Sequence, residues 1–206
     1  MAADQETIRR VAHLLRRAGF GATPDEIQSY AAKGLAATVD ELVNYADQPD
    51  DLDAMYSKIS GDLLDPHNLE DIQTWWLYRM AHTSHPLQEK MTLFWHGHFA
   101  TAMYKVNDGQ FMQQQNDTLR KLALGNFKDI VTAMAKDPAM LVWLDGDTNR
   151  KGAPNENFGR ELMELFTLGI GNYSEDDVRE AARALTGYQL DKDRHFVYNA
   201  KQHDDG

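Results

Sequence analysis

The sequence contains no cysteine, and this absence excludes a disulfide bond, a thiolate metal site and a cysteine nucleophile. It does not indicate a compartment, because a chain without cysteine suits reducing and oxidising surroundings alike. No apolar run approaches the ~20 residues of a membrane span. The N-terminal stretch MAADQETIRR shows no signal peptide, because it lacks an apolar segment, so the localisation stays open.

Basic residues are also scarce in this chain of 206 residues. Lys and Arg number 21 against 32 Asp and Glu, which gives a formal net charge of −11. We therefore expect no nucleic-acid partner, since phosphate binding needs clustered Lys and Arg. Hydrophobic residues make up 42% and charged residues 26% of the chain, a composition typical of a soluble globular protein with a core.

The pattern that is present is helical. In the first segment Ile8, Leu15 and their apolar neighbours recur at three- and four-residue spacing, the period of an amphipathic helix. Thr23 before Pro24, and Ser174 before three carboxylates, are typical helix starts. The sequence predicts an all-α fold, an irregular bundle of roughly ten helices. We assign its core to helices over residues 86–100, 107–124, 156–168 and 175–186.

The pattern changes after Gly187, where residues 195–198 indicate a short strand or the start of a hairpin. We therefore expect a helical domain over residues 1–187. Residues 188–206 are interpreted as the start of a C-terminal segment that this chain does not complete.

Five segments, in order along the chain, carry a resemblance to a known family. They are HLLRRAGFG at 13–21, MTLFWHGHFAT at 91–101, DPAML at 137–141, NENFGRELMELFTLG at 155–169 and AARALTGY at 181–188. Together they resemble DUF1800, an uncharacterised bacterial family. The resemblance implies a helical fold and supplies neither an agreed activity nor established catalytic residues.

The chain departs from the usual pattern of that family in three ways. Gly159 stands where Ala is more frequent, and Tyr188 stands where Trp is more usual. Family members also usually continue past the segment around His203. A partner suggested by the resemblance is therefore the protein's own C-terminal part. No other protein or small-molecule partner is indicated.

The loop over residues 145–156 has the spacing of a calcium-binding loop. Asp145, Asp147, Asn149 and Glu156 occupy the first, third, fifth and twelfth places, where an EF-hand presents oxygen ligands. Arg150 occupies the sixth place, where Gly normally makes the sharp turn. The alternative is a solvated loop between two helices. The only cofactor that these patterns suggest is a divalent cation.

A second candidate site lies on the expected helix over 156–168. At 100° per residue, one face is apolar and Glu161 falls at its edge; the face is formed by Phe158, Leu162, Leu165 and Phe166. A buried carboxylate needs a hydrogen bond, a metal or a cation opposite it. The simplest partner is a core arginine, with Arg16, Arg17 and Arg183 as the candidates.

Two histidines could complete a centre with Glu161 and Glu164. His96 and His98 are two residues apart, so on a regular helix only one of them faces inward. The first functional hypothesis is a helical binding or scaffold module. The alternative is a metal-assisted hydrolase with a Glu/His centre between helices 86–100 and 156–168. Its candidate catalytic residues are Glu161, Glu164, His96 and His98.

One basic cluster lies near the end of the first expected helix. His13 precedes Arg16 and Arg17 by about one turn, so the three side chains could bind an anion together. The alternative is a solvated basic helix end, which complements the negative end of the helix dipole.

Overall fold

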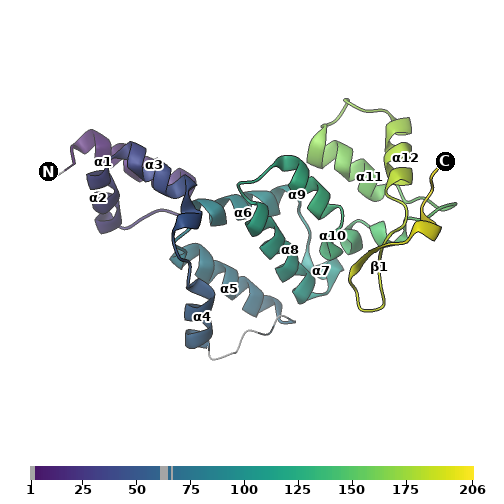
Figure 1. Ribbon diagram of the computed structural model, residues 1–206, viewed down its shortest axis with the longest axis horizontal. Coiled ribbons are helices and arrows are strands. Elements are labelled where there is room, and N and C mark those ends of the chain that lie inside the picture. The colour runs from purple at the N-terminus through teal and green to yellow at the C-terminus, as the bar shows by residue number, and fades with distance from the viewer. Residues whose placement is uncertain (1–2, 61–64, 66) are drawn as a thin grey trace. The chain divides into compact units, whose positions relative to one another are not determined.

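A computed structural model describes residues 3–60, 65 and 67–206 (Figure 1). The fold is mostly helical, which confirms the predicted class: the described part of the chain holds twelve α-helices and one two-stranded hairpin. The chain divides into two compact units, Met1–Phe94 and Trp95–Gly206. The division falls inside α6 (Pro86–His98). Along the described residues, no helix combines the length and apolar character needed to cross a bilayer.

The first unit begins with three helices that pack on one another. They are α1 (Gln5–Ala18), α2 (Pro24–Lys33) and α3 (Leu35–Val43). The predicted start at Thr23 is confirmed, since its side chain and that of Glu26 form a reciprocal capping box. The buried core of this group consists of Val11, Leu15, Ala31 and Leu42.

A 3-10 turn (Tyr45–Asp47), α4 (Leu52–Ser60) and α5 (Leu69–His82) complete the first unit with the start of α6. A buried arginine holds this part together. Arg79 is only 5% exposed and forms ion pairs with Asp50, Asp53 and Glu89 at 3.2, 2.6 and 3.5 Å. Glu89 is itself buried and accepts a hydrogen bond from Trp76 Nε1 at 2.6 Å.

The second unit continues from α6 through a series of short helices. They are α7 (Met103–Val106), α8 (Gly109–Leu122), α9 (Phe127–Met134), α10 (Pro138–Trp143), a 3-10 turn (Gly146–Thr148), α11 (Asn157–Glu161), a π-helix (Leu162–Thr167) and α12 (Glu175–Ala184). The helix predicted over 107–124 starts late, because Asn107 is left-handed and Asp108 caps α8.

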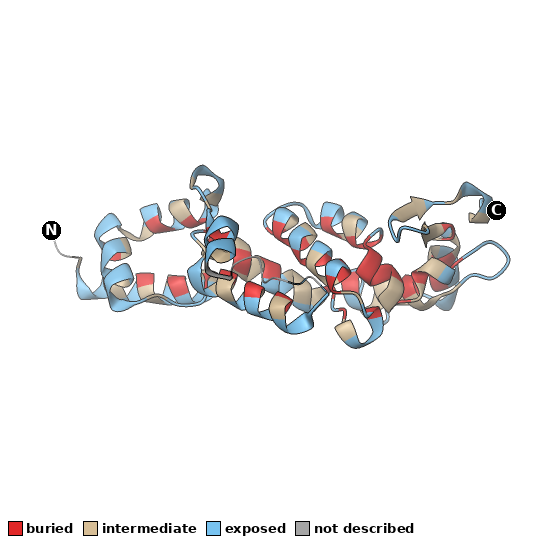
Figure 2. Cartoon of the chain, turned by 90° about the horizontal axis from the view of Figure 1, so that it is seen from below, coloured by how far each residue is buried: buried red, intermediate tan, exposed pale blue. Residues whose placement is uncertain are grey.

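The core of the second unit lies on the inner faces of these helices, where Figure 2 shows buried residues in red. Its fully buried members include Phe99, Leu119, Ile130 and Met140. Helices α11 and α12 approach closely at Gly159, where a Cβ atom would lie 3.0 Å from the backbone nitrogen of Ala182. The glycine at this position therefore sets the packing distance of the pair.

The chain then forms a hairpin from β1 (Tyr188–Leu190) and β2 (Phe196–Tyr198), which pair antiparallel. The predicted strand is confirmed, and its partner is a segment of this same chain. Gly187 makes the entry possible, since its φ is +84° and a Cβ there would lie 2.6 Å from the Asn199 carbonyl oxygen. Residues 188–206 fall within the second unit. That they begin a further segment stays a prediction.

Candidate functional site

The segment after α11 has an unusual backbone. Residues Leu162–Thr167 form a π-helix, in which Leu168 N donates to the Met163 carbonyl oxygen five residues back at 2.9 Å. The Thr167 hydroxyl likewise donates to the Leu162 carbonyl oxygen at 2.6 Å. Such turns are rare and occur frequently at functional sites. This segment is therefore the strongest candidate for a functional site in the second unit.

The π-helix overturns part of the predicted apolar face. Phe158 and Phe166 are buried as expected, but Leu165 is 60% exposed. The prediction assumes 100° per residue throughout, and a π-turn inserts an extra residue into the repeat. Leu165 is thereby turned out of the core and toward solvent.

The two glutamates at this helix have different surroundings. Glu161 is half-buried, and within the described residues its side chain forms no ion pair or hydrogen bond. The arginine partner predicted for it is not seen there, since Arg183 pairs with Glu180 at 2.6 Å. Glu164 accepts a hydrogen bond from the Tyr173 hydroxyl at 3.0 Å.

An ion-pair cluster fixes the start of α11 against α12. Arg160 pairs with Glu156, one turn earlier, at 3.2 Å and with Glu175 of α12 at 2.7 Å. The hydrogen bond from Arg160 holds the pKa of the Glu175 carboxyl below its usual value. The cluster supports the segment on which Glu161 and the π-helix lie.

Of the two predicted histidines, His98 reaches the π-helix. Its Nε2 lies 3.0 Å from the Phe166 carbonyl oxygen, and since a carbonyl only accepts, Nε2 is the donor. Its ring also contacts Phe99 and Phe127, at centroid distances of 4.7 and 6.1 Å. His96 is half-buried, and burial lowers its pKa. At neutral pH we therefore expect its ring to be uncharged.

Three of the four residues of the predicted calcium loop form ion pairs or hydrogen bonds with other protein groups. Asp145 pairs with Lys105 at 2.9 Å, and Glu156 pairs with Arg160 as described above. Asn149 is 2% exposed; it donates to the Ala182 carbonyl oxygen at 2.7 Å and accepts from Asn155 N at 2.9 Å.

Asp147, the remaining residue of the predicted calcium set, lies on the 3-10 turn. Among the described residues no three His, Asp or Glu side chains come together in a group that could hold a metal ion. Neither the calcium loop nor the Glu/His metal centre gains support from this arrangement.

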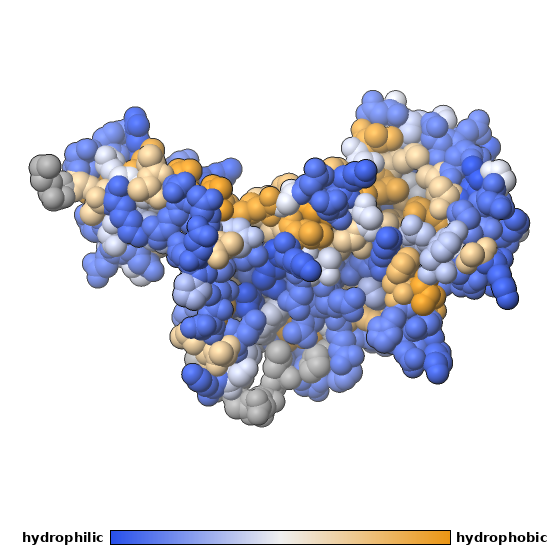
Figure 3. All heavy atoms as spheres, viewed as in Figure 1, coloured by the Kyte–Doolittle hydropathy of each residue, from blue (hydrophilic) through white to orange (hydrophobic). Residues whose placement is uncertain are grey.

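An apolar surface surrounds the π-helix instead. Leu165, Leu168 and Ile170 are 60, 50 and 80% exposed, and Phe127, at the start of α9, is 41% exposed. We call these four residues the π-helix patch. Figure 3 shows apolar side chains gathered around α11 on the face that it displays.

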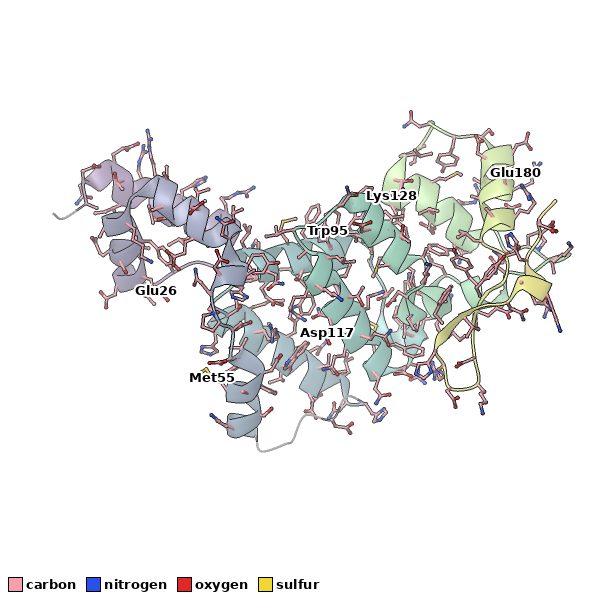
Figure 4. All side chains as sticks on the ribbon, viewed as in Figure 1. Glu26, Met55, Trp95, Asp117, Lys128 and Glu180 are labelled. Carbon is pink, nitrogen blue, oxygen red and sulfur yellow. The ribbon has the colours of Figure 1, made fainter. Side chains whose placement is uncertain are left out.

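Aromatic contacts connect the two parts of the patch. His98 lies beside both Phe127 and Phe166, at centroid distances of 6.1 and 6.0 Å. Phe127 also stacks on Trp95 at 5.8 Å, and Trp95 is labelled beside the helix of Lys128 in Figure 4. Sequence patterns alone do not predict this surface. Its one visible signal is Ile170, an apolar residue between Gly169 and Gly171, both of which have positive φ.

Comparison with known proteins identifies a family without a described activity. The model of the family described as "Protein of unknown function (DUF1800)" matches residues 13–206. No curated protein and no solved structure matches the chain.

Proposed function

The chain belongs to the DUF1800 family, and from that premise we propose that it is a helical binding module whose π-helix patch docks an amphipathic protein segment bearing a cationic side chain. The family description names no activity, so the proposal rests on the side chains themselves.

The observation that carries the proposal is the exposure of Leu165, Leu168 and Ile170 within six residues of chain. Single exposed apolar residues are normal on a protein surface, but a contiguous group is typical of an interaction site. Covering such side chains removes apolar area from water, which stabilises a complex by about 25 cal/mol for each Å² buried.

The segment below the patch is held in place before any partner arrives. His98 donates to the Phe166 carbonyl oxygen, and the Tyr173 hydroxyl donates to Glu164. Arg160 joins the same segment to α12 through Glu175. A pre-ordered surface loses less conformational entropy on binding than a mobile one, which favours a docking role.

Glu161 indicates the charge of the partner. It lies one turn before Leu165, is half-buried and has no ion pair within the described residues. A partner that covers Leu165 with apolar groups also removes water from this carboxylate, which is costly unless a cation accompanies it. A Lys or Arg on the docking segment meets that requirement.

The test uses the absence of cysteine, because one introduced thiol can be labelled uniquely. We replace Ile170 by Cys, attach an environment-sensitive fluorophore and titrate a synthetic amphipathic helix of leucine and lysine. The matched control carries the label at Leu77→Cys, since Leu77 is 64% exposed and belongs to the first unit. A saturable blue shift at position 170, absent at position 77, is the expected result.

Two further arms test the chemistry of the patch. In the label-170 protein, Leu165→Gln and Leu168→Gln keep the net charge and should weaken binding by about tenfold or more. Glu161→Gln should weaken it less, because one carboxylate is lost and the apolar contacts remain. Equal affinity in the leucine variants, or equal binding of a sequence-scrambled peptide, would sink the proposal.

A further inference from the structure

A second surface, in the first unit, is lined by basic side chains, whereas the charged residue beside the π-helix patch is the acidic Glu161. α1 and α3 line an open groove of about 820 Å³. The polar side chains of α1 that line it are mostly basic, and we call them its rim: they are Arg9, Arg10, His13, Arg16 and Arg17, beside one acidic residue, Glu6. Its floor is apolar, with Leu14 of α1 and with Leu35 and Val39 of α3. We call it the α1–α3 groove.

The charge of the groove contrasts with that of the chain. α1 holds four of the 21 basic residues and one of the 32 acidic ones. That one acidic residue, Glu6, pairs with Arg9 and Arg10 at 2.8 and 2.7 Å. Arg16 and Arg17 are exposed and form no ion pair within the described residues. Two guanidinium groups are thus available for an anion.

The apolar floor continues beyond the basic rim. Leu35, Val39 and Val43 are spaced by four residues, so they form one stripe along α3. Val39 is 42% and Val43 is 53% exposed, although Thr38 and Leu42 of the same helix are buried. From Glu6 to Arg17 the groove follows α1 for about 17 Å, or three helical turns.

We propose that the α1–α3 groove binds an acidic amphipathic helix of a partner protein. The groove suits a helix that lies along it, because it is three turns long and has an apolar floor and a basic rim. The apolar side chains of that helix would face the floor, and its carboxylates would face Arg16 and Arg17. The groove is open along its length, whereas small-molecule sites enclose most of their ligand. It takes the opposite charge from the π-helix patch and is independent of that proposal.

Two other anionic partners fit less well. A membrane surface would be reached by inserting the apolar face of α1, but Val11 and Leu15 of that face are 0 and 4% exposed in the core. A nucleic acid would approach a chain of net charge −11 and would leave the leucine and valine floor unused. The acidic helix uses both the rim and the floor.

The experiment measures binding of a fluorescent synthetic helix of leucine and glutamate to the whole protein by anisotropy. Arg16→Glu with Arg17→Glu should weaken binding by about tenfold or more. The matched control is Lys128→Glu with Lys192→Glu, which changes the net charge equally at exposed positions of the second unit. Val39→Gln should weaken binding without a change in charge. Circular dichroism checks that each variant is folded.

Each alternative occupant has its own arm. The proposal fails if the arginine variant binds the helix as tightly as wild type, or if polyglutamate competes as well as the amphipathic helix. It also fails if vesicles of anionic lipid bind through Arg16 and Arg17 and the helix does not. A concentration-dependent dimer of the wild type that the arginine variant abolishes would assign the groove to a second copy and overturn the proposal.

Discussion

Asp137 shows how one side chain joins several elements of the second unit. It caps α10, where its Oδ1 accepts from Met140 N at 2.9 Å, and it also accepts from Gln115 of α8 at 2.7 Å. Gln115 in turn accepts from the Thr101 hydroxyl at 2.6 Å. The carboxyl group is only 4% exposed, and burial raises its pKa to about 6. The DPAML segment of the family resemblance therefore begins with a structural residue.

The raised pKa makes a pH-dependent contribution to stability. Between the unfolded value of 3.8 and about 6, the folded state binds the Asp137 proton more tightly than the unfolded state. This group therefore adds stability below pH 3.8 and loses that contribution as pH rises to about 6, by about 2–3 kcal/mol. Asp137→Asn keeps the capping oxygen and removes the titration.

Urea unfolding at several pH values checks this expectation. The stability difference between wild type and Asp137→Asn should move in favour of the asparagine variant as pH rises from 3.8 to about 6. Other carboxyls, such as those of Glu26 and Asp177, have lowered pKa values. They change the pH dependence of the free energy of unfolding equally in both proteins, so they cancel in the difference. A constant difference across this range would contradict the burial argument.

At the scale of elements, local signals predict where helices begin better than how they continue. Ser174 caps α12 with Asp177, a reciprocal contact that depends only on residues three apart. The π-helix has no comparable local signature, and one of its contacts comes from far along the chain, since His98 of α6 donates to the Phe166 carbonyl oxygen. Extending the α-helical repeat through that segment places Leu165 in the core and Glu161 in a buried pair.

The contacts of the predicted calcium loop likewise cannot be predicted from residues that are close in sequence. The spacing of Asp145 and Asn149 is visible in the sequence, but their partners Lys105 and Ala182 lie far away along the chain. The Asp145 carboxylate accepts from Lys105, and the Asn149 side-chain oxygen accepts from Asn155 N, so both oxygens already have hydrogen-bond donors. That this loop holds a divalent cation therefore stays a prediction from spacing alone.

The hairpin depends on one glycine. Gly187→Ala should destabilise the second unit by more than the ~1–3 kcal/mol of a strained left-handed residue, because the new Cβ would also meet backbone atoms. Gly152→Ala is the matched control, since Gly152 has a φ of +79° and a Cβ there would meet no described heavy atom within 4 Å. Thermal unfolding compares the two variants. Equal losses of stability would show that contact with the Asn199 carbonyl oxygen has no cost.

At the scale of the molecule, the two compact units differ in what holds them. The first unit combines a small apolar core around Val11 with an ion-pair cluster around the buried Arg79, whereas the second has a large aromatic and aliphatic core around Phe99. Removing one member of a buried ion cluster leaves the others uncompensated, typically at about 3–5 kcal/mol. Damage to that cluster should therefore remain in its own unit.

Hydrogen exchange measured by mass spectrometry tests this independence. Arg79→Met should raise exchange in peptides from α4 and α5 and leave those from α8 and α10 unchanged. Arg179→Met is the control, because Arg179 and its partner Asp176 are both exposed and such pairs contribute little. A parallel rise in α8 would mean that the two units unfold as one.

The π-helix has a consequence for how length variation acts in this chain. Six residues, Leu162–Thr167, occupy this turn, and deleting any one of them would allow the segment to return to α-helical geometry. The positions that follow the deletion on the same helix, up to its cap Leu168, would then rotate by about 100° around the helix axis. Leu168 would point in another direction, and a deletion at any of these positions other than Leu165 would rearrange the π-helix patch while all four of its side chains remained. The number of residues in this turn, rather than their identity, therefore determines the direction in which the exposed side chains point.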